Sequence, residues 1–164
     1  MAKNDPTRQI EQPLEEYSET VVQINRISKK TKGGNQMRFS ALVVAGDRNG
    51  KVGVALAKAK DVRSAVQKAF KYAKRDMVEI PLMGTTVPYE VSHKYNAARI
   101  LIKPAPTGSG IIAGGPMRIV LEAAGVRDAV GKILGTSNKI SNVYATVDAL
   151  KKLGRISMRK EATK

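Results

Sequence analysis

The sequence contains no cysteine, no tryptophan and a single histidine, and only 4% of its residues are aromatic. Without cysteine the chain forms neither disulfide bonds nor thiolate metal sites, and His93 by itself cannot build a histidine metal cluster. No apolar run approaches the roughly 20 residues that a membrane-spanning helix requires, and residues 1–13 lack the apolar stretch of a secretory signal. We therefore expect a cytoplasmic protein with no membrane segment, no cofactor, no metal and no catalytic residue.

Lysine and arginine, by contrast, are abundant. The 164 residues include 29 of them against 14 acidic side chains, which gives a net charge of +15. The charge is unevenly placed: residues 1–20 carry −3, residues 21–80 carry +10 and residues 81–154 carry +5. Such an excess indicates a polyanionic partner, and we expect the first half of the chain to meet it most strongly.

The first half of the chain predicts a flexible leader followed by a small α+β domain. Residues 1–16 are polar and contain two prolines. The apolar spacing after Asp61, a candidate N-cap, predicts one helix on one face of an antiparallel sheet. Alternating and β-branched residues predict its three strands, over residues 21–27, 37–46 and 52–57. We expect this domain to span residues 17–80 and a linker to follow over 81–86.

The second half predicts another α+β domain over residues 87–154, with a basic tail over 155–164. Its pattern predicts two strands, a helix entered through Pro116, a third strand and a last helix over 142–153. Strands are expected over residues 87–92, 98–103 and 126–134. The predicted fold class is therefore α+β, with two two-layer domains.

Five cations surround the adjacent glycines Gly33 and Gly34, namely Arg26, Lys29, Lys30, Lys32 and Arg38. Glycine lets backbone N–H groups approach phosphate oxygens, and flexible cations neutralise the phosphate charge. A solvated loop whose lysines keep a sheet edge soluble would show the same pattern. The charge of the surrounding domain favours phosphate binding, and the few aromatic residues favour recognition of RNA backbone and shape over base stacking.

A second glycine-rich segment, residues 106–118, runs into a predicted helix, as phosphate-binding loops do. Its spacing does not match the known phosphate-binding motifs, because Pro116 follows Gly114 and Gly115 where a lysine would be needed. The segment also contains no Asp or Glu that could hold Mg²⁺. We therefore favour a structural loop packed closely against neighbouring backbone.

Two long motifs resemble the bacterial family of small-subunit ribosomal protein five. They are KGGNQMRFSALVVAGDRNGKVG with AKDVRSAVQKA, and GSGIIAGGPMRIVLEAAGV with GTSN, and they cover residues 21–150 in the family's order. The resemblance implies a first domain like the double-stranded-RNA-binding fold without its leading helix, and a second, C-terminal β-α-β-α domain. It also implies a non-catalytic constituent of the small ribosomal subunit that binds ribosomal RNA, supports assembly and translational accuracy, and borders the messenger entry path.

The resemblance further implies which residues meet which partner. In the family a hairpin approaches ribosomal RNA, which implies the RNA-binding residues Arg26, Ser28, Lys29, Lys30, Lys32, Gly33, Gly34 and Arg38. The family's glycine-rich segment faces ribosomal protein four, which implies a protein interface at Gly110, Gly114, Gly115 and Arg118. Ribosomal protein eight is a second expected neighbour, and messenger RNA passes nearby.

Three positions depart from the family's pattern: Asn35 replaces a basic residue, and Lys139 and Tyr144 differ near the last helix. The chain after Leu150 is expected to lack a final helical segment that many relatives carry. These departures predict one phosphate contact fewer in the hairpin and reduced docking against protein eight.

Two other functions remain open from the sequence alone. A small-molecule kinase would bind ATP and need a Mg²⁺ carboxylate, for which Glu122 and Asp128 are poorly placed in the sequence. A free RNA chaperone would leave the ribosomal particle in moderate salt, whereas a ribosomal protein would stay with it.

Overall fold

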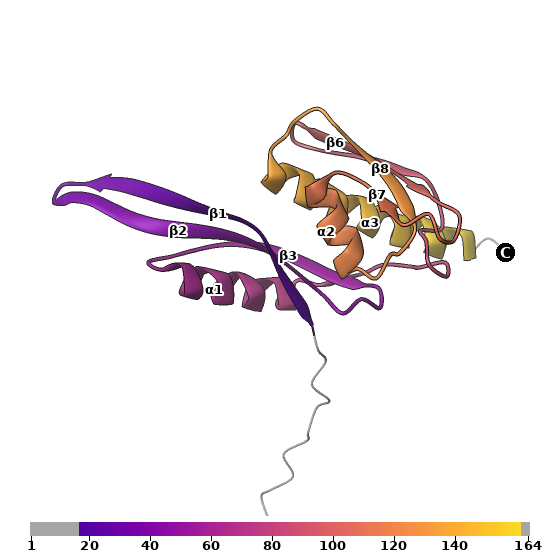
Figure 1. Ribbon diagram of the computed structural model, residues 1–164, viewed down its shortest axis with the longest axis horizontal. Coiled ribbons are helices and arrows are strands. Elements are labelled where there is room, and N and C mark those ends of the chain that lie inside the picture. Colours follow the sequence, from indigo (N-terminus) through magenta and orange to yellow (C-terminus); the bar gives the residue numbers. More distant parts are fainter. Residues whose placement is uncertain (1–16, 162–164) are drawn as a thin grey trace, which may run out of the picture.

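The computed structural model describes residues 17–161, and the side chains of residues 17–156. Its elements form two four-stranded sheets, with the strand orders β1-β2-β3-β4 and β5-β6-β8-β7. Figure 1 shows α2 and α3 between the two sheets and α1 on the outer face of the first sheet. The prediction of an α+β fold with two domains is confirmed.

The first sheet is antiparallel throughout, and α1 (Val62–Arg75) covers one of its faces. Its strands are β1 (Ser18–Thr31), β2 (Gly34–Gly46), β3 (Lys51–Ala59) and the short β4 (Val78–Glu79). Strand β4 was not expected, because two residues are too few to show a period.

Alternate residues of β2 and β3 pack against different neighbours. Ala41 and Ala57 lie against Ala65 and Ala69 of α1, so small side chains on both sides bring the helix close to the sheet. The larger side chains of the opposite face enter the main core, and these are Leu42, Val44, Val52 and Val54. Both faces of the first sheet are therefore buried where β2 pairs with β3.

Helix α1 begins where the sequence predicted. The carboxylate of Asp61 accepts hydrogen bonds from the Ser64 backbone N–H at 3.0 Å and from the Ser64 hydroxyl at 2.6 Å. The hydroxyl and backbone hydrogen bonds from Ser64 lower the pKa of Asp61. This N-cap satisfies one of the backbone donors at the start of the helix.

The second half consists of a mixed sheet and two helices. Its elements are β5 (Val91–Tyr95), β6 (Ala98–Pro104), β7 (Ile111–Ile112), α2 (Gly115–Ala123), β8 (Ala129–Leu134) and α3 (Lys139–Glu161). The strand expected over 87–92 begins only at Val91 and continues to Tyr95. It ends there because Asn96 adopts a left-handed conformation, with a φ of 51°, and forms a tight turn. The strand expected from residue 126 begins at Ala129.

Helix α3 is longer than its sequence pattern predicted. It begins at Lys139, where the Asn138 side chain accepts the backbone N–H of Ile140 at 3.1 Å. It then continues through Gly154 to Glu161, so the expected end at Leu153 and the expected lack of a final helical segment are wrong. A glycine in a helix interior costs about 1 kcal/mol relative to alanine. Helix α3 nevertheless continues past Gly154.

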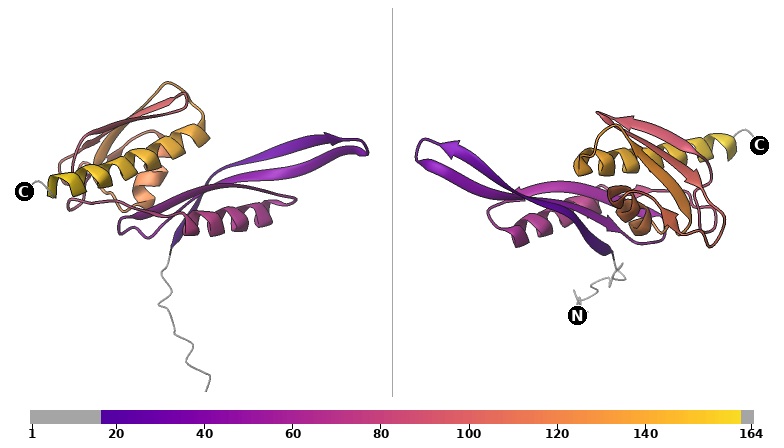
Figure 2. Two further views of the ribbon diagram at one scale, coloured as in Figure 1. Left: turned by 180° about the vertical axis from the view of Figure 1, so that it is seen from behind. Right: turned by 45° about the horizontal axis from the view of Figure 1, so that its top comes forward.

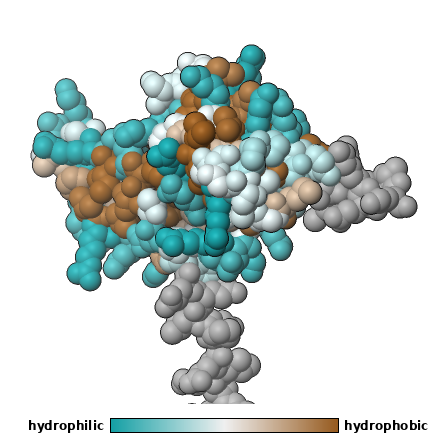
Figure 3. All heavy atoms as spheres, turned by 45° about the vertical axis from the view of Figure 1, so that its right-hand side comes forward, coloured by the Kyte–Doolittle hydropathy of each residue, from teal (hydrophilic) through white to brown (hydrophobic). Residues whose placement is uncertain are grey.

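The two halves of the molecule share one hydrophobic core. Leu42 and Val52 of the first sheet belong to the same buried cluster as Leu121 of α2 and Leu150 and Leu153 of α3. Hydrophilic side chains surround the hydrophobic patches on the face shown in Figure 3. Among the described residues, no helix is long and apolar enough to span a membrane.

Backbone hydrogen bonds fix the junction between the halves. The N–H of Arg48 donates to the carbonyl of Ala123 at 3.1 Å, and the N–H of Gly50 donates to Ala124 at 2.9 Å. The N–H groups of Arg127 and Asp128 donate to the carbonyl of Thr85 at 2.8 and 3.0 Å, within the segment expected as a linker. That segment is therefore bound to the second half, while the exact domain boundaries stay a prediction.

Replacing Gly46 by alanine should destabilise the protein. A Cβ at this position would overlap the backbone carbonyl of Ala123 across the junction. We expect Gly46→Ala to lower the free energy of unfolding by about 1–3 kcal/mol, the usual cost of overpacking a core. Chemical denaturation of the purified protein measures this decrease. Gly33→Ala is the control, since nothing lies within 4 Å of a Cβ there, and an equal decrease in the control would contradict the junction as the cause.

Candidate nucleic-acid interface

The predicted basic loop is the end of a long β-hairpin. Strands β1 and β2 pair as far as Thr31 and Gly34, so only Lys32 and Gly33 form the turn. The sequence predicted strands only over residues 21–27 and 37–46, so both strands extend further into the basic segment than expected. Cross-strand hydrogen bonds satisfy the backbone and hold the charged side chains on a regular ribbon.

This ribbon projects beyond the body of the protein. Strand β3 ends at Ala59, which pairs with Phe39 of β2, so residues 27–38 have no third strand beside them. Figure 2 shows from two directions that the hairpin reaches past the end of α1 and away from the second half. Every residue from Ser28 to Arg38 is exposed. We call residues 26–38 the basic hairpin.

The predicted RNA-binding residues all lie on the basic hairpin, but on different faces of it. The register pairs Ile27 with Arg38 and Lys29 with Gln36. Because side chains alternate along a strand, Lys29 and Arg38 share one face. The opposite face carries Arg26, Ser28 and Lys30.

The cations of the basic hairpin are not neutralised within the described chain. Residues 26–38 include no carboxylate, and no ion pair joins a cation of this segment to another described residue. The guanidinium of Arg38 donates to the Gln36 side chain at 3.4 Å, and the Thr31 hydroxyl donates to the Gly34 carbonyl at 2.8 Å. The exposed ribbon thus presents unpaired positive charge on both faces.

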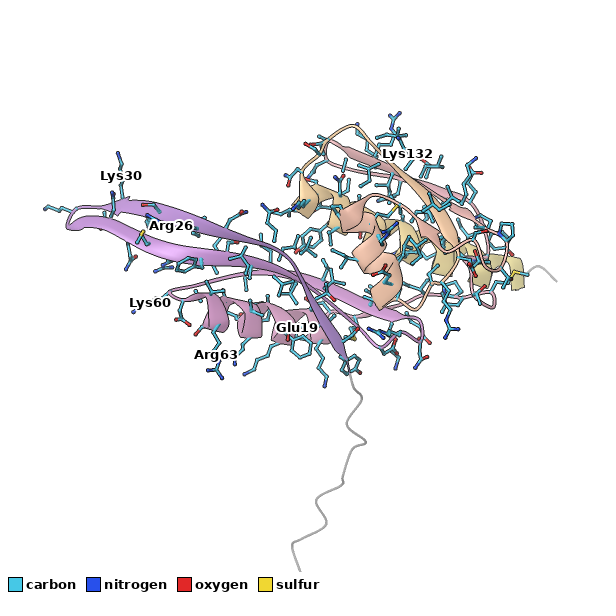
Figure 4. The ribbon with its side chains drawn as sticks, in the orientation of Figure 1. Glu19, Arg26, Lys30, Lys60, Arg63 and Lys132 are labelled. Atoms are coloured by element: carbon cyan, nitrogen blue, oxygen red, sulfur yellow. The ribbon has the colours of Figure 1, made fainter. Side chains whose placement is uncertain are left out.

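Two further cations, Lys60 and Arg63, were not singled out from the sequence as part of this surface. Ala59 pairs with Phe39, so the next residues along the two strands are Lys60 and Arg38. Figure 4 shows Lys60 and Arg63 at the same end of the molecule as Arg26 and Lys30, and Lys132 on the distant second sheet. Only the pairing of β2 with β3 brings these residues together, and no local pattern in the sequence shows that pairing.

The glycine-rich segment is organised around a buried carboxylate. Asp128, with 4% of its surface exposed, accepts hydrogen bonds from the N–H groups of Gly108 at 3.0 Å and Gly110 at 2.9 Å. The Thr85 side chain and these backbone N–H groups lower the pKa of Asp128. The backbone N–H groups of the loop that could bind a phosphate already donate to this carboxylate, which supports a structural role for the loop.

The predicted protein-interface residues lie together around the start of α2. Gly114 is its N-cap and Gly115 its first residue, and both are exposed. The exposed guanidinium of Arg118 donates to the carbonyl of Ile111 at 2.9 Å and so ties the helix to β7. Gly110 lies in the preceding loop, where its φ of 70° suits glycine.

The carboxylates considered for a kinase do not form a magnesium site. Asp128 is engaged by the loop, and Glu122 is exposed on α2. No group of three potential metal ligands occurs among residues 17–156.

An exposed cationic ribbon on an α+β scaffold defines a protein of the nucleic-acid-binding class. Family models match the chain in two consecutive parts: ribosomal protein S5, N-terminal domain, over residues 17–81, and ribosomal protein S5, C-terminal domain, over residues 93–162. The chain belongs to the ribosomal protein S5 family. This family is structural and non-enzymatic, and it binds the RNA of the small ribosomal subunit together with other ribosomal proteins.

Replacing Asp128 should change how stability depends on pH. Its pKa is lower in the folded protein than the unfolded value of about 3.9. The ionised group therefore stabilises the fold above that unfolded value, and this contribution disappears as the pH falls through the lower folded value. We expect Asp128→Asn to be less stable than wild type at pH 7 and to lose less stability between pH 7 and pH 2.

Thermal unfolding at a series of pH values measures this difference. Glu19→Gln removes an exposed carboxylate and is expected to keep wild-type stability at pH 7. Parallel pH profiles for wild type and Asp128→Asn would show that Asp128 does not organise the loop.

Proposed function

We propose that the basic hairpin docks this chain onto small-subunit ribosomal RNA through phosphate contacts. The observation that carries the proposal is the two-stranded ribbon of residues 27–38, which extends beyond β3 with exposed, unpaired cations. Phosphate contacts supply affinity and position without reading base identity. Lys29 and Arg38 on one face, and Arg26 and Lys30 on the other, suit insertion of the ribbon between two RNA segments.

We further propose that the surface around the start of α2 contacts ribosomal protein four. Gly114, Gly115 and Arg118 are exposed there, and the tie from Arg118 to Ile111 holds the surface in one shape. Through these contacts the protein would support subunit assembly and translational accuracy beside the messenger path. Ribosomal protein eight is proposed as a second neighbour.

Neutralising the lysines of the hairpin tip should weaken RNA binding and reduce its dependence on salt. Each phosphate contact contributes about 0.7 to 0.9 to the slope of log affinity against log salt. We expect Lys29→Gln, Lys30→Gln and Lys32→Gln, combined in one variant, to reduce that slope by this amount for each phosphate that is no longer bound. Filter binding to a small-subunit ribosomal RNA transcript over a series of KCl concentrations measures the slope.

A second triple variant, with Lys94, Arg99 and Lys132 each changed to Gln, provides the control for net charge. These exposed residues lie on β5, β6 and β8 of the second sheet, and Figure 4 shows Lys132 far from the hairpin. We expect the control to keep the wild-type slope. An unchanged slope in the hairpin variant would refute the proposed docking.

Reversing the charge at Arg118 should weaken the proposed protein contact. Arg118→Glu removes the donor to Ile111 and places a carboxylate on the exposed surface of α2. We expect affinity for purified ribosomal protein four to fall at least about tenfold, since truncating a hot-spot arginine at the centre of an interface costs about 2 kcal/mol or more. Arg99→Glu is the control on another exposed surface, and wild-type affinity of the Arg118 variant would count against this interface.

A further inference from the structure

A cleft between the two halves of the molecule brings together three arginines from separate parts of the chain. Arg48 comes from the turn between β2 and β3, Arg118 from α2, and Arg127 from the segment before β8. Ser18 and Thr20 of β1 and Glu122 of α2 also line it. This cluster arises only when the halves are docked against each other.

The backbone of Arg48 is held in an unfavourable conformation at this cleft. Its φ of 58° lies in the left-handed region, which glycine adopts far more readily than arginine. The hydrogen bond from its N–H to Ala123, at 3.1 Å, fixes that conformation at the junction. Backbone strain of this kind concentrates at functional sites, where a side chain is needed in a set position.

The arginines of the cleft have unused hydrogen-bond donors. The side chains of Arg48 and Arg127 are exposed and form no hydrogen bond or ion pair with any residue whose side chain the structure describes. Arg118 uses one nitrogen on the carbonyl of Ile111. Glu122 is the only carboxylate among the lining residues, and it forms no ion pair with them. The cleft thus retains a net positive charge.

The position of the cleft favours RNA phosphate as its ligand. Guanidinium groups bind phosphate oxygens through paired hydrogen bonds. Strand β1 runs from Ser18 and Thr20 at the cleft to Lys30 at the hairpin tip. At about 3.3 Å per residue, Thr20 and Lys30 are roughly 33 Å apart along the strand. One structured RNA can therefore reach both clusters.

We propose that the cleft is a second phosphate-binding site for the same RNA, with Arg48 and Arg127 as the phosphate ligands and Arg118 adding positive charge from the adjoining protein interface. The inference rests on the proposed docking of the basic hairpin and extends it to two separate contacts, which lie near opposite ends of β1. Two contacts on one RNA strengthen binding beyond either contact alone, because the second forms at a high effective concentration.

Two substitutions test the cleft without disturbing the proposed protein interface at Arg118. Arg48→Gly removes a cation and relieves the left-handed backbone, so we expect thermal stability to be retained. Arg127→Gln removes the second cation. With the small-subunit ribosomal RNA transcript as probe, we expect the double variant to reduce the salt slope by about 0.7 to 0.9 for each phosphate that is no longer bound. Lys94→Gln with Lys132→Gln removes the same charge from the second sheet and should keep the wild-type slope.

The hairpin variant, measured in parallel, separates the two proposals. A reduced slope for the hairpin variant with a wild-type slope for Arg48→Gly with Arg127→Gln overturns the cleft site and leaves the hairpin docking intact. A wild-type slope for the hairpin variant with a reduced slope for Arg48→Gly with Arg127→Gln supports phosphate binding at the cleft and refutes docking through the hairpin. Equal reductions in the cleft variant and its control overturn the cleft as a specific site. Wild-type RNA binding together with weakened binding to purified ribosomal protein four also overturns it and assigns the arginines to carboxylates of that protein.

Discussion

The close contact between the end of α2 and the turn after β2 determines how the two halves are arranged. Two backbone hydrogen bonds join Arg48 and Gly50 to Ala123 and Ala124, and a Cβ at Gly46 or Gly125 would overlap the opposite backbone. Such backbone contact leaves little freedom for one half to move against the other. The shared core, the direction of the projecting hairpin and the arginine cleft all depend on it.

Buried and exposed charges in this protein have opposite roles. Asp128 is ionised in the interior because Thr85, Gly108 and Gly110 donate hydrogen bonds to it, and its charge holds a glycine-rich loop in one conformation. The cations of the basic hairpin have no such partners among the described residues. Their mutual repulsion is tolerated because the ribbon is held by its backbone, and a polyanion that neutralises them would stabilise the protein by mass action.

Much of the fold and part of the candidate site could be predicted from local patterns. Alternation indicated the long strands, and the side chain of Asp61 marked the start of α1. The charge around Gly33 and Gly34 indicated the basic hairpin, and the family matches agree with the resemblance of the motifs. Lys60 was missed, because its place beside Arg38 depends on strand pairing.

The sequence by itself determined the fold class, the positions of most elements and the family, because periodicity, caps and motifs are properties of short segments. Only the tertiary structure decided that the basic loop is a paired ribbon, that Asp128 binds Gly108 and Gly110, and that Arg48 and Arg127 face one cleft. The physical reason is that these contacts join segments far apart in the chain. Packing of the whole core, rather than the conformational preference of a short segment, determines which distant segments meet.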